Sequence, residues 1–307
     1  MAAGSSPSRI SPAPTACVVL TGPDLELTVL PDLGARLHRL RAFGHDILHT
    51  PRDPAHHGRD PFFWGAYHMA PWCNRLVAGQ QQVGRRRIDL AANFRDGSAI
   101  HGQVYVRPWQ QTGEGQFTVV AGGDGWPWPY EVNVTMEIGA TSARNAASLV
   151  IEQRLRNLAD EPMPAGLGLH PWFSRPVEVA IHAASVYQRN TDEHASLEAV
   201  AGDFDLRLLG PMASGLDATW TNLDQPPVQV RWPAFSLAAT ISSTSPSLHV
   251  TAASPTDIDG LAVEPESHTS FGLDRLIEGE PGGMRWLEPG ETLGQRIDIQ
   301  IEQVGGT

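Results

Sequence analysis

Several segments of the chain alternate hydrophobic and polar residues with a period of two. In residues 131–138, valine, methionine and isoleucine occupy every second position, with glutamate, asparagine and threonine between them. Residues 149–157 and 297–302 repeat the pattern with leucine and isoleucine. This alternation is typical of a β-strand with one buried face. We therefore predict that these three segments are strands of a sheet that covers a hydrophobic core.

Other parts of the chain extend this prediction to an all-β fold. The pattern contains no amphipathic helix longer than about two turns and no regular alternation of strands and helices. Doubly wound and TIM-barrel folds are therefore disfavoured. The 30 glycines and 25 prolines are spread along the chain, as turns between many strands require. Shorter predicted strands cover residues 25–30, 36–43, 117–120, 228–232 and 248–252.

The domain organisation is predicted to be simple. Residues 1–16 are small, polar and proline-rich, which indicates a flexible N-terminal tail. No internal repeat or low-complexity linker divides the rest of the chain. We expect residues 17–307 to form a single large antiparallel β-sandwich, with the functional site on long loops between strands.

Composition removes several classes of function. The net charge of −12 argues against binding to nucleic acid or to an anionic membrane. No apolar run approaches the ~20 residues of a membrane span, and residues 1–16 lack the apolar core of a signal peptide. We expect a cytoplasmic protein that is a monomer or homodimer.

The basic residues are all arginine. Without lysine, the chain cannot use Schiff-base chemistry, anchor pyridoxal phosphate or provide a P-loop lysine. The two cysteines, Cys17 and Cys73, form neither a disulfide framework nor a CxxC metal motif. We therefore expect no metal and no cofactor.

Two ionisable residues stand in distinctive settings. His170 lies in GLGLHPWF and Glu264 lies in LAVEPESH, each within an apolar run and each directly before a proline. The proline rings of Pro171 and Pro265 restrict the backbone there. An imidazole and a carboxylate can act together as general acid and general base. Each residue also has a structural reading, His170 as a core histidine and Glu264 as a strand-end carboxylate.

Other polar residues are candidates for binding. Asn74 and Arg75 lie in APWCNRLVAGQ, His101 lies in IHGQVYVRPW, and Asp217 lies in SGLDATWTNL. An arginine among apolar residues must be paired or directed at a ligand, although Arg75 can also be structural and Asp217 a turn residue. The aromatic residues Trp72, Trp172 and Phe173 are candidates for an apolar platform, whereas the role of residues 124–130 stays open.

These motifs together resemble the aldose 1-epimerase (galactose mutarotase-like) family. They occur in the family's order, as NR followed by glycine, HG, histidine before Pro-aromatic, aspartate after Gly-Leu, EP, and a closing PGET. The resemblance covers the chain from about residue 25 to the last predicted strand. It implies a β-supersandwich with a sugar-binding cleft.

The resemblance also implies a role for each candidate residue. His170 would be the general acid and Glu264 the general base that interconvert the α and β anomers of a hexose or related aldose. Arg75, His101 and Asp217 would hold the sugar, and Asn74 would support Arg75. The sequence departs from the family in having no glutamine before the EP motif, so the preferred sugar stays open.

Two alternatives remain beside this hypothesis. A hexose-6-phosphate mutarotase would need arginines for the phosphate, and residues 85–87 form an arginine-rich segment, otherwise predicted to be a solvated hairpin. A sugar-binding protein without turnover would keep the cleft and lose the catalysis.

Overall fold

Antiparallel β-structure makes up most of the chain. The fold is seen in a computed structural model that describes residues 16–139, 145–245 and 247–305. A 17-stranded antiparallel sheet dominates it, which confirms the predicted fold class. The predicted tail, residues 1–16, lies outside the described residues except for Ala16, and the first strand begins at Val18.

One half of the large sheet carries the longest strands. Adjacent strands pair antiparallel throughout this half. In spatial order its strands are β10 (Gln110–Gly113), β11 (Gln116–Gly123), β12 (Trp126–Gly139), β13 (Ala146–Asn157), β23 (Thr292–Gln303) and β19 (Leu237–Thr244).

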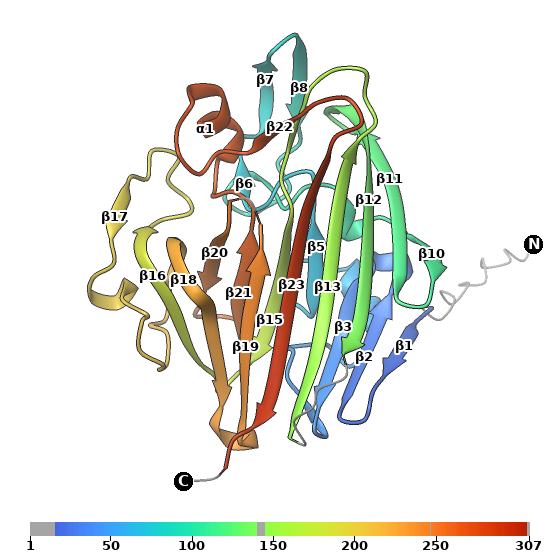
Figure 1. Cartoon of the computed structure of the whole chain (residues 1–307). Helices are drawn as coiled ribbons and strands as arrows, with labels where there is room; N and C mark the ends of the chain where they lie inside the picture. Colours follow the sequence, from blue (N-terminus) through green and yellow to red (C-terminus); the bar gives the residue numbers. More distant parts are fainter. Residues whose placement is uncertain (1–15, 140–144, 246, 306–307) are drawn as a thin grey trace, which may run out of the picture.

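The other half lies behind the first in the view of Figure 1. The short strand β4 (His45–Asp46) extends it by pairing with β3. In spatial order its strands are β1 (Val18–Thr21), β2 (Leu25–Leu30), β3 (Arg36–Ala42), β5 (Ala66–Met69), β15 (Gly168–Ser174), β21 (Gly260–Glu266) and β20 (His249–Ala253).

The two halves are joined through β18 (Asp217–Trp232) and β16 (Glu178–Tyr187). The first part of β18, residues 217–220, pairs with β20, and its last part, residues 228–232, pairs with β19. Strand β16 follows β18 along both parts, and β17 (Leu197–Ala199) forms its outer edge. A single sheet therefore folds into two layers around one core.

Shorter elements cover the ends of the sandwich. Three two-stranded ribbons, one helix and five 3-10 turns complete the described fold. They are β6 (Arg75–Leu76) with β9 (Ala99–Ile100), β7 (Gly79–Val83) with β8 (Arg86–Leu90), β14 (Met163–Ala165) with β22 (Arg285–Leu287), α1 (Gly272–Glu278), and the turns Pro31–Leu33, Pro54–Gly58, Val104–Val106, Gly202–Phe204 and Pro233–Phe235.

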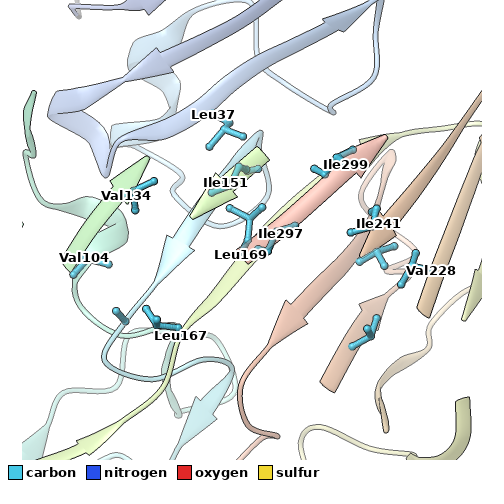
Figure 2. Packing of buried hydrophobic residues seen from close by; sticks show 14 of the residues in the cluster. Leu37, Val104, Val134, Ile151, Leu167, Leu169, Val228, Ile241, Ile297 and Ile299 are labelled. Carbon is cyan, nitrogen blue, oxygen red and sulfur yellow. The ribbon is translucent and has the colours of Figure 1, made fainter. Parts of the chain in front are cut away.

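Side chains from both layers meet in the core. Figure 2 shows Ile151, Ile297 and Ile299 of one half in the same cluster as Leu37 and Leu169 of the other. Each is at most 2% exposed, and burying such a side chain is worth about 1.5–3 kcal/mol. The alternating positions that predicted strands are therefore the positions that hold the two layers together.

Candidate active site

His170 and Glu264 lie opposite each other on neighbouring strands. In the antiparallel register of β15 and β21, Gly168 pairs with Glu266 and Trp172 with Ala262, so His170 faces Glu264. Directly opposed side chains in such a pair start about 4.5–5.5 Å apart at Cβ. The imidazole Nε2 of His170 comes within 3.1 Å of the Glu264 carboxyl oxygen Oε1. The expectation that loops carry this part of the site is wrong, because two adjacent strands fix both side chains.

Burial changes the protonation of this pair. Burial, followed by the positive charge of Arg36, holds the pKa of His170 well below its ordinary value. Burial and the nearby Glu266 and Asp217 carboxyl groups hold the pKa of Glu264 well above its ordinary value. Two separated charges are expensive in such a setting. The pair is therefore expected to hold one proton between its two partners at neutral pH.

Aromatic rings hold the imidazole of His170 in place. Tyr67 of β5 stacks on His170 with ring centroids 4.5 Å apart and planes inclined by 26°. The ring of His101 meets His170 edge-on, with centroids 4.8 Å apart. The contacts on two sides restrict rotation of the His170 side chain.

The backbone around His101 explains why glycine follows it. His101 has a φ of +64°, and its backbone N–H donates to the Asn74 carbonyl over 2.9 Å. Gly102 has a φ of +75°, and a Cβ there would lie 2.0 Å from the carbonyl oxygen of Ala70. Only glycine tolerates this approach. The HG motif thus fixes the His101 ring, whose pKa burial lowers well below its ordinary value.

Arg75 is held by three side chains. Its Nε donates to Asp96 over 2.7 Å, one terminal nitrogen donates to Asn74 over 3.0 Å, and the other lies 3.1 Å from Asp217. Burial opposes the positive charge, but the carboxylates of Asp217 and Asp96 outweigh it and raise the pKa of Arg75. The guanidinium is therefore charged and fixed in orientation.

Asn74 and Asp217 are positioned in turn by a buried polar network. The Asn74 amide nitrogen lies 3.4 Å from the Thr251 hydroxyl, and the Ser270 hydroxyl donates to the Asn74 side-chain oxygen over 3.0 Å. Asn190 donates to Asp217 over 2.7 Å. These bonds tie β6, β18 and β20 together at one end of the sandwich.

A cavity of about 370 Å³ connects these residues to the surface, a size within the usual range for small-molecule sites. The structure thus brings all six predicted site residues to one cavity. They are Asn74, Arg75, His101, His170, Asp217 and Glu264.

Aromatic side chains form an apolar wall of this cavity. Trp172 lines it, as the sequence suggested, together with Phe62, Phe63 and Phe94. The expectation that Trp72 and Phe173 also form this platform is wrong. Both are buried in the core, Trp72 against Trp126 and Phe173 against Trp232.

Residues 124–130, whose role the sequence left open, do not line the cavity. Trp126, Trp128 and Tyr130 of this segment are buried core residues of β12. The arginine-rich segment forms the turn and start of the exposed β7–β8 hairpin, where Arg86 pairs with Glu161. It borders a different surface hollow, lined among others by Arg85 and Trp286.

Sequence reasoning missed several cavity residues. Phe62, Phe63 and Phe94 lie in loops, where no periodic pattern marks them. The run DPFFW, with three consecutive aromatic residues outside any predicted strand, was the available signal. Asp96 was also missed, although it holds Arg75 and accepts hydrogen bonds from the backbone and hydroxyl of Ser98.

In the described part of the chain, no set of three or more His, Cys, Asp or Glu side chains is arranged to hold a metal ion. Among residues 16–139, 145–245 and 247–305, no helix has the length and apolar character to cross a bilayer.

The two-layered antiparallel fold with this cavity is that of the galactose mutarotase-like proteins. The chain belongs to the aldose 1-epimerase family, whose model matches residues 16–300. The match makes the chain an isomerase of the mutarotase type. No match was found among curated protein sequences.

Solved structures agree with this fold. The chain is similar to an aldose epimerase homologue from C. elegans, with 17% identity over 94% of this chain and 99% of the other and a TM-score of 0.77. A galactose mutarotase-like protein from Clostridium acetobutylicum gives 15% identity over 94% and 95%, with a TM-score of 0.77. A protein from Synechocystis sp. PCC 6803 gives 21% identity over 97% and 100%, with a TM-score of 0.74.

Proposed function

We propose that the chain interconverts the α and β anomers of an unphosphorylated hexose or related aldose, with His170 as general acid and Glu264 as general base. The observation that carries the proposal is the 3.1 Å approach of His170 Nε2 to Glu264 Oε1 beside the cavity. The pair provides one proton donor and one proton acceptor for the two oxygen atoms attached to C1.

The one proton that the His170–Glu264 pair holds is enough for the reaction. In the reactive form His170 is protonated and Glu264 is ionised. Glu264 removes the proton of the C1 hydroxyl while His170 gives its proton to the ring oxygen O5, and the C1–O5 bond breaks to leave an open-chain aldehyde. Glu264 is then protonated and His170 neutral. After rotation about C1–C2, both protons return and the ring closes on the other face, so the enzyme is unchanged.

The remaining polar residues are assigned to binding. The fixed Arg75 guanidinium and the Asp217 carboxylate offer donors and acceptors to sugar hydroxyls, and His101 offers a neutral imidazole beside His170. Asn74 keeps Arg75 in place. The aromatic wall, including Phe62 and Trp172, suits the apolar C–H face of a pyranose.

The charges around the cavity favour a neutral sugar over a sugar phosphate. The arginines that line it are Arg75 and Arg95, and each is paired with a carboxylate. Asp96, Asp217 and Asp257 line the same cavity. A phosphate would meet more negative than positive charge there. The arginines proposed as its partners, residues 85–87, lie outside the cavity lining.

The buried acid–base pair also favours an enzyme over a binding protein. A binding site gains little from an imidazole and a carboxyl group that share a proton, because burying them is costly. Saturation-transfer NMR across a panel of aldoses tests the proposal. Enzyme-dependent exchange between the two anomeric signals is expected for at least one neutral aldose. Tight binding without added exchange would establish the non-catalytic alternative instead.

A further inference from the structure

A second buried carboxyl group lies two residues beyond Glu264 on the same strand. Residues two apart on a strand share a face, so Glu264 and Glu266 of β21 point to the same side. Glu264 is 2% exposed and Glu266 is 0% exposed. Fully buried glutamates are rare unless they are paired. Glu266 does not line the cavity, so substrate contact does not explain its presence.

Hydrogen bonding accounts for only half of this pair. The Thr251 hydroxyl donates to Glu266 Oε2 over 2.7 Å, and Glu264 Oε1 lies against His170. The remaining oxygens, Glu264 Oε2 and Glu266 Oε1, are buried and make no hydrogen bond within the described structure, although the Asn74 amide lies near enough to lower the pKa of Glu266. A carboxylate can only accept hydrogen bonds. Two such oxygens are satisfied when one carboxyl group carries a proton and donates it to the other.

Charge leads to the same conclusion. Arg75 lowers the pKa of Glu264, but its guanidinium is already bound by Asp96 and Asp217. Burial raises the pKa of Glu266 to about 8, and burial and the charge of Glu266 raise the pKa of Glu264. The two carboxyl groups interact directly, because Glu266 raises the pKa of Glu264 whereas Glu264 lowers the pKa of Glu266. Two carboxyl groups in one buried site do not both ionise near neutral pH.

We propose that Glu266 is a positioning residue for the base, sharing one buried proton with Glu264 so that Glu264 Oε1 stays directed at His170 and the cavity. In the reactive form this proton lies on Glu266, while the separate proton of the His170–Glu264 pair lies on His170. The Glu266 hydroxyl then donates to the ionised Glu264 and orients it to act as base. The predicted effect of Glu266 on the reaction rate rests on the proposed function. The shared proton itself can be observed without any substrate.

The groups around Glu264 and Glu266 offer few other places for the shared proton. On β15, Gly168 leaves room for Glu266, because a Cβ there would lie 3.3 Å from the Glu266 Cγ atom. The burial of Cys73 raises the pKa of its thiol, and burial lowers the pKa of His249 to about 4, so both are neutral near pH 7. The titratable or charged groups that face the pair are Tyr67, Cys73, Arg75, His170, Asp217 and His249.

Two substitutions of Glu266 distinguish the effect of its titratable proton from the effect of its size and hydrogen-bond donor. Glu266→Gln keeps the size and can donate an N–H to Glu264, but it cannot titrate. We expect the kcat/KM of this variant to fall less than about tenfold at pH 7. If loss of the Glu266 proton, whose pKa is about 8, sets the alkaline limb of the native pH profile, that limb should move up by about one unit or more in this variant. Glu266→Met removes the donor, and its kcat is expected to fall about 10- to 100-fold with a smaller change in KM. Glu302→Gln, at an exposed glutamate, is the matched control and should leave the profile unchanged.

Carbon-13 NMR of carboxyl-labelled glutamate provides the readout that needs no activity. The native protein should show two glutamate signals that titrate well above the ordinary glutamate range, that of Glu266 near pH 8, and both signals should be altered in Glu266→Gln but not in Glu302→Gln. Glutamates that all finish titrating below about pH 6 would overturn the inference, as would an unshifted pH profile in Glu266→Gln. If the native protein accelerates no aldose, the proposed function fails, and the NMR titration still decides whether the proton is shared.

Discussion

Arg75 and Asp217 form an ion pair of 3.1 Å that connects the short strand β6 with the start of the long strand β18. Asp217 is also the residue at which β18 begins to pair with β20, the neighbour of β21. The ion pair therefore connects the Arg75 side of the cavity to the strands that carry the proposed acid–base pair, His170 and Glu264.

Removal of Arg75 should weaken sugar binding more than it slows turnover. Arg75→Met is expected to raise KM about tenfold or more, because it removes charge-assisted hydrogen bonds and leaves Asp96 and Asp217 without their partner. The free energy of unfolding should fall by about 1–3 kcal/mol. Steady-state kinetics and urea unfolding measure the two effects. Arg95→Met, which removes an exposed arginine of the same cavity, is the control, and an equal rise in KM in both variants would refute a specific role for Arg75.

The HG motif offers a test that leaves every polar residue in place. Gly102→Ala would push a methyl group to 2.0 Å from the Ala70 carbonyl oxygen and displace His101, so we expect loss of both stability and activity. Gly84→Ala is the matched control, since Gly84 also has a positive φ, of +57°, but has open space around it. The melting temperature should drop clearly further for Gly102→Ala than for Gly84→Ala. Similar values for the two variants would show that close packing at Gly102 is unimportant.

Stability should fall as the pH drops from about 6.5 to about 4. Burial lowers the pKa of His57 to about 2, of His68 to about 3, and of His249 and His268 to about 4. The unfolded chain binds these protons near pH 6.5 and the folded chain does not, so acid favours unfolding. The raised pKa values of Glu264 and Glu266 act in the opposite direction above about pH 4.5, but the four histidines outnumber these two carboxyl groups.

Urea unfolding at several pH values measures this slope. Each histidine contributes about 1.4 kcal/mol per pH unit where it is protonated only in the unfolded state. His249→Gln should reduce the slope, and His194→Gln, which replaces an exposed histidine, should not. A free energy of unfolding that stays constant between pH 6.5 and 4 would contradict the burial of these histidines as neutral groups.

The choice between a neutral sugar and a sugar phosphate is a separate prediction. Because carboxylates outnumber arginines around the cavity, kcat/KM should be higher for glucose or galactose than for their 6-phosphates. Anomeric exchange measured by NMR at matched concentrations compares them. A clear preference for a 6-phosphate would replace the neutral aldose with a phosphorylated substrate while leaving the acid–base pair intact.

The strands were largely predictable from sequence because their signal is local. The period of two identified residues 131–138 and 297–302, which lie in β12 and β23, and the segment 25–30 coincides with β2. Gln153 shows a limit of the pattern. It lies on the buried face of β13, where its amide donates to the Gly168 carbonyl over 3.0 Å, a partner that only the folded chain supplies.

The residues of the candidate site could be proposed from sequence, but the way in which the fold brings them together could not. Family motifs indicated His170 and Glu264, but the register that opposes them depends on pairing between strands far apart in sequence. The aromatic wall escaped prediction for a related reason. Phe62 and Phe94 lie on separate loops that meet only in the fold, with ring centroids 5.3 Å apart.

The most direct test of the acid–base assignment is enzyme-catalysed anomer exchange in His170→Ala and Glu264→Gln, followed by saturation-transfer NMR and by polarimetry on freshly dissolved α-sugar. Each variant should stay folded and lose about 10²–10⁴-fold in rate. The controls His194→Ala and Glu302→Gln should keep the native rate, because both residues are exposed. Native rates in either folded His170→Ala or folded Glu264→Gln would contradict the account.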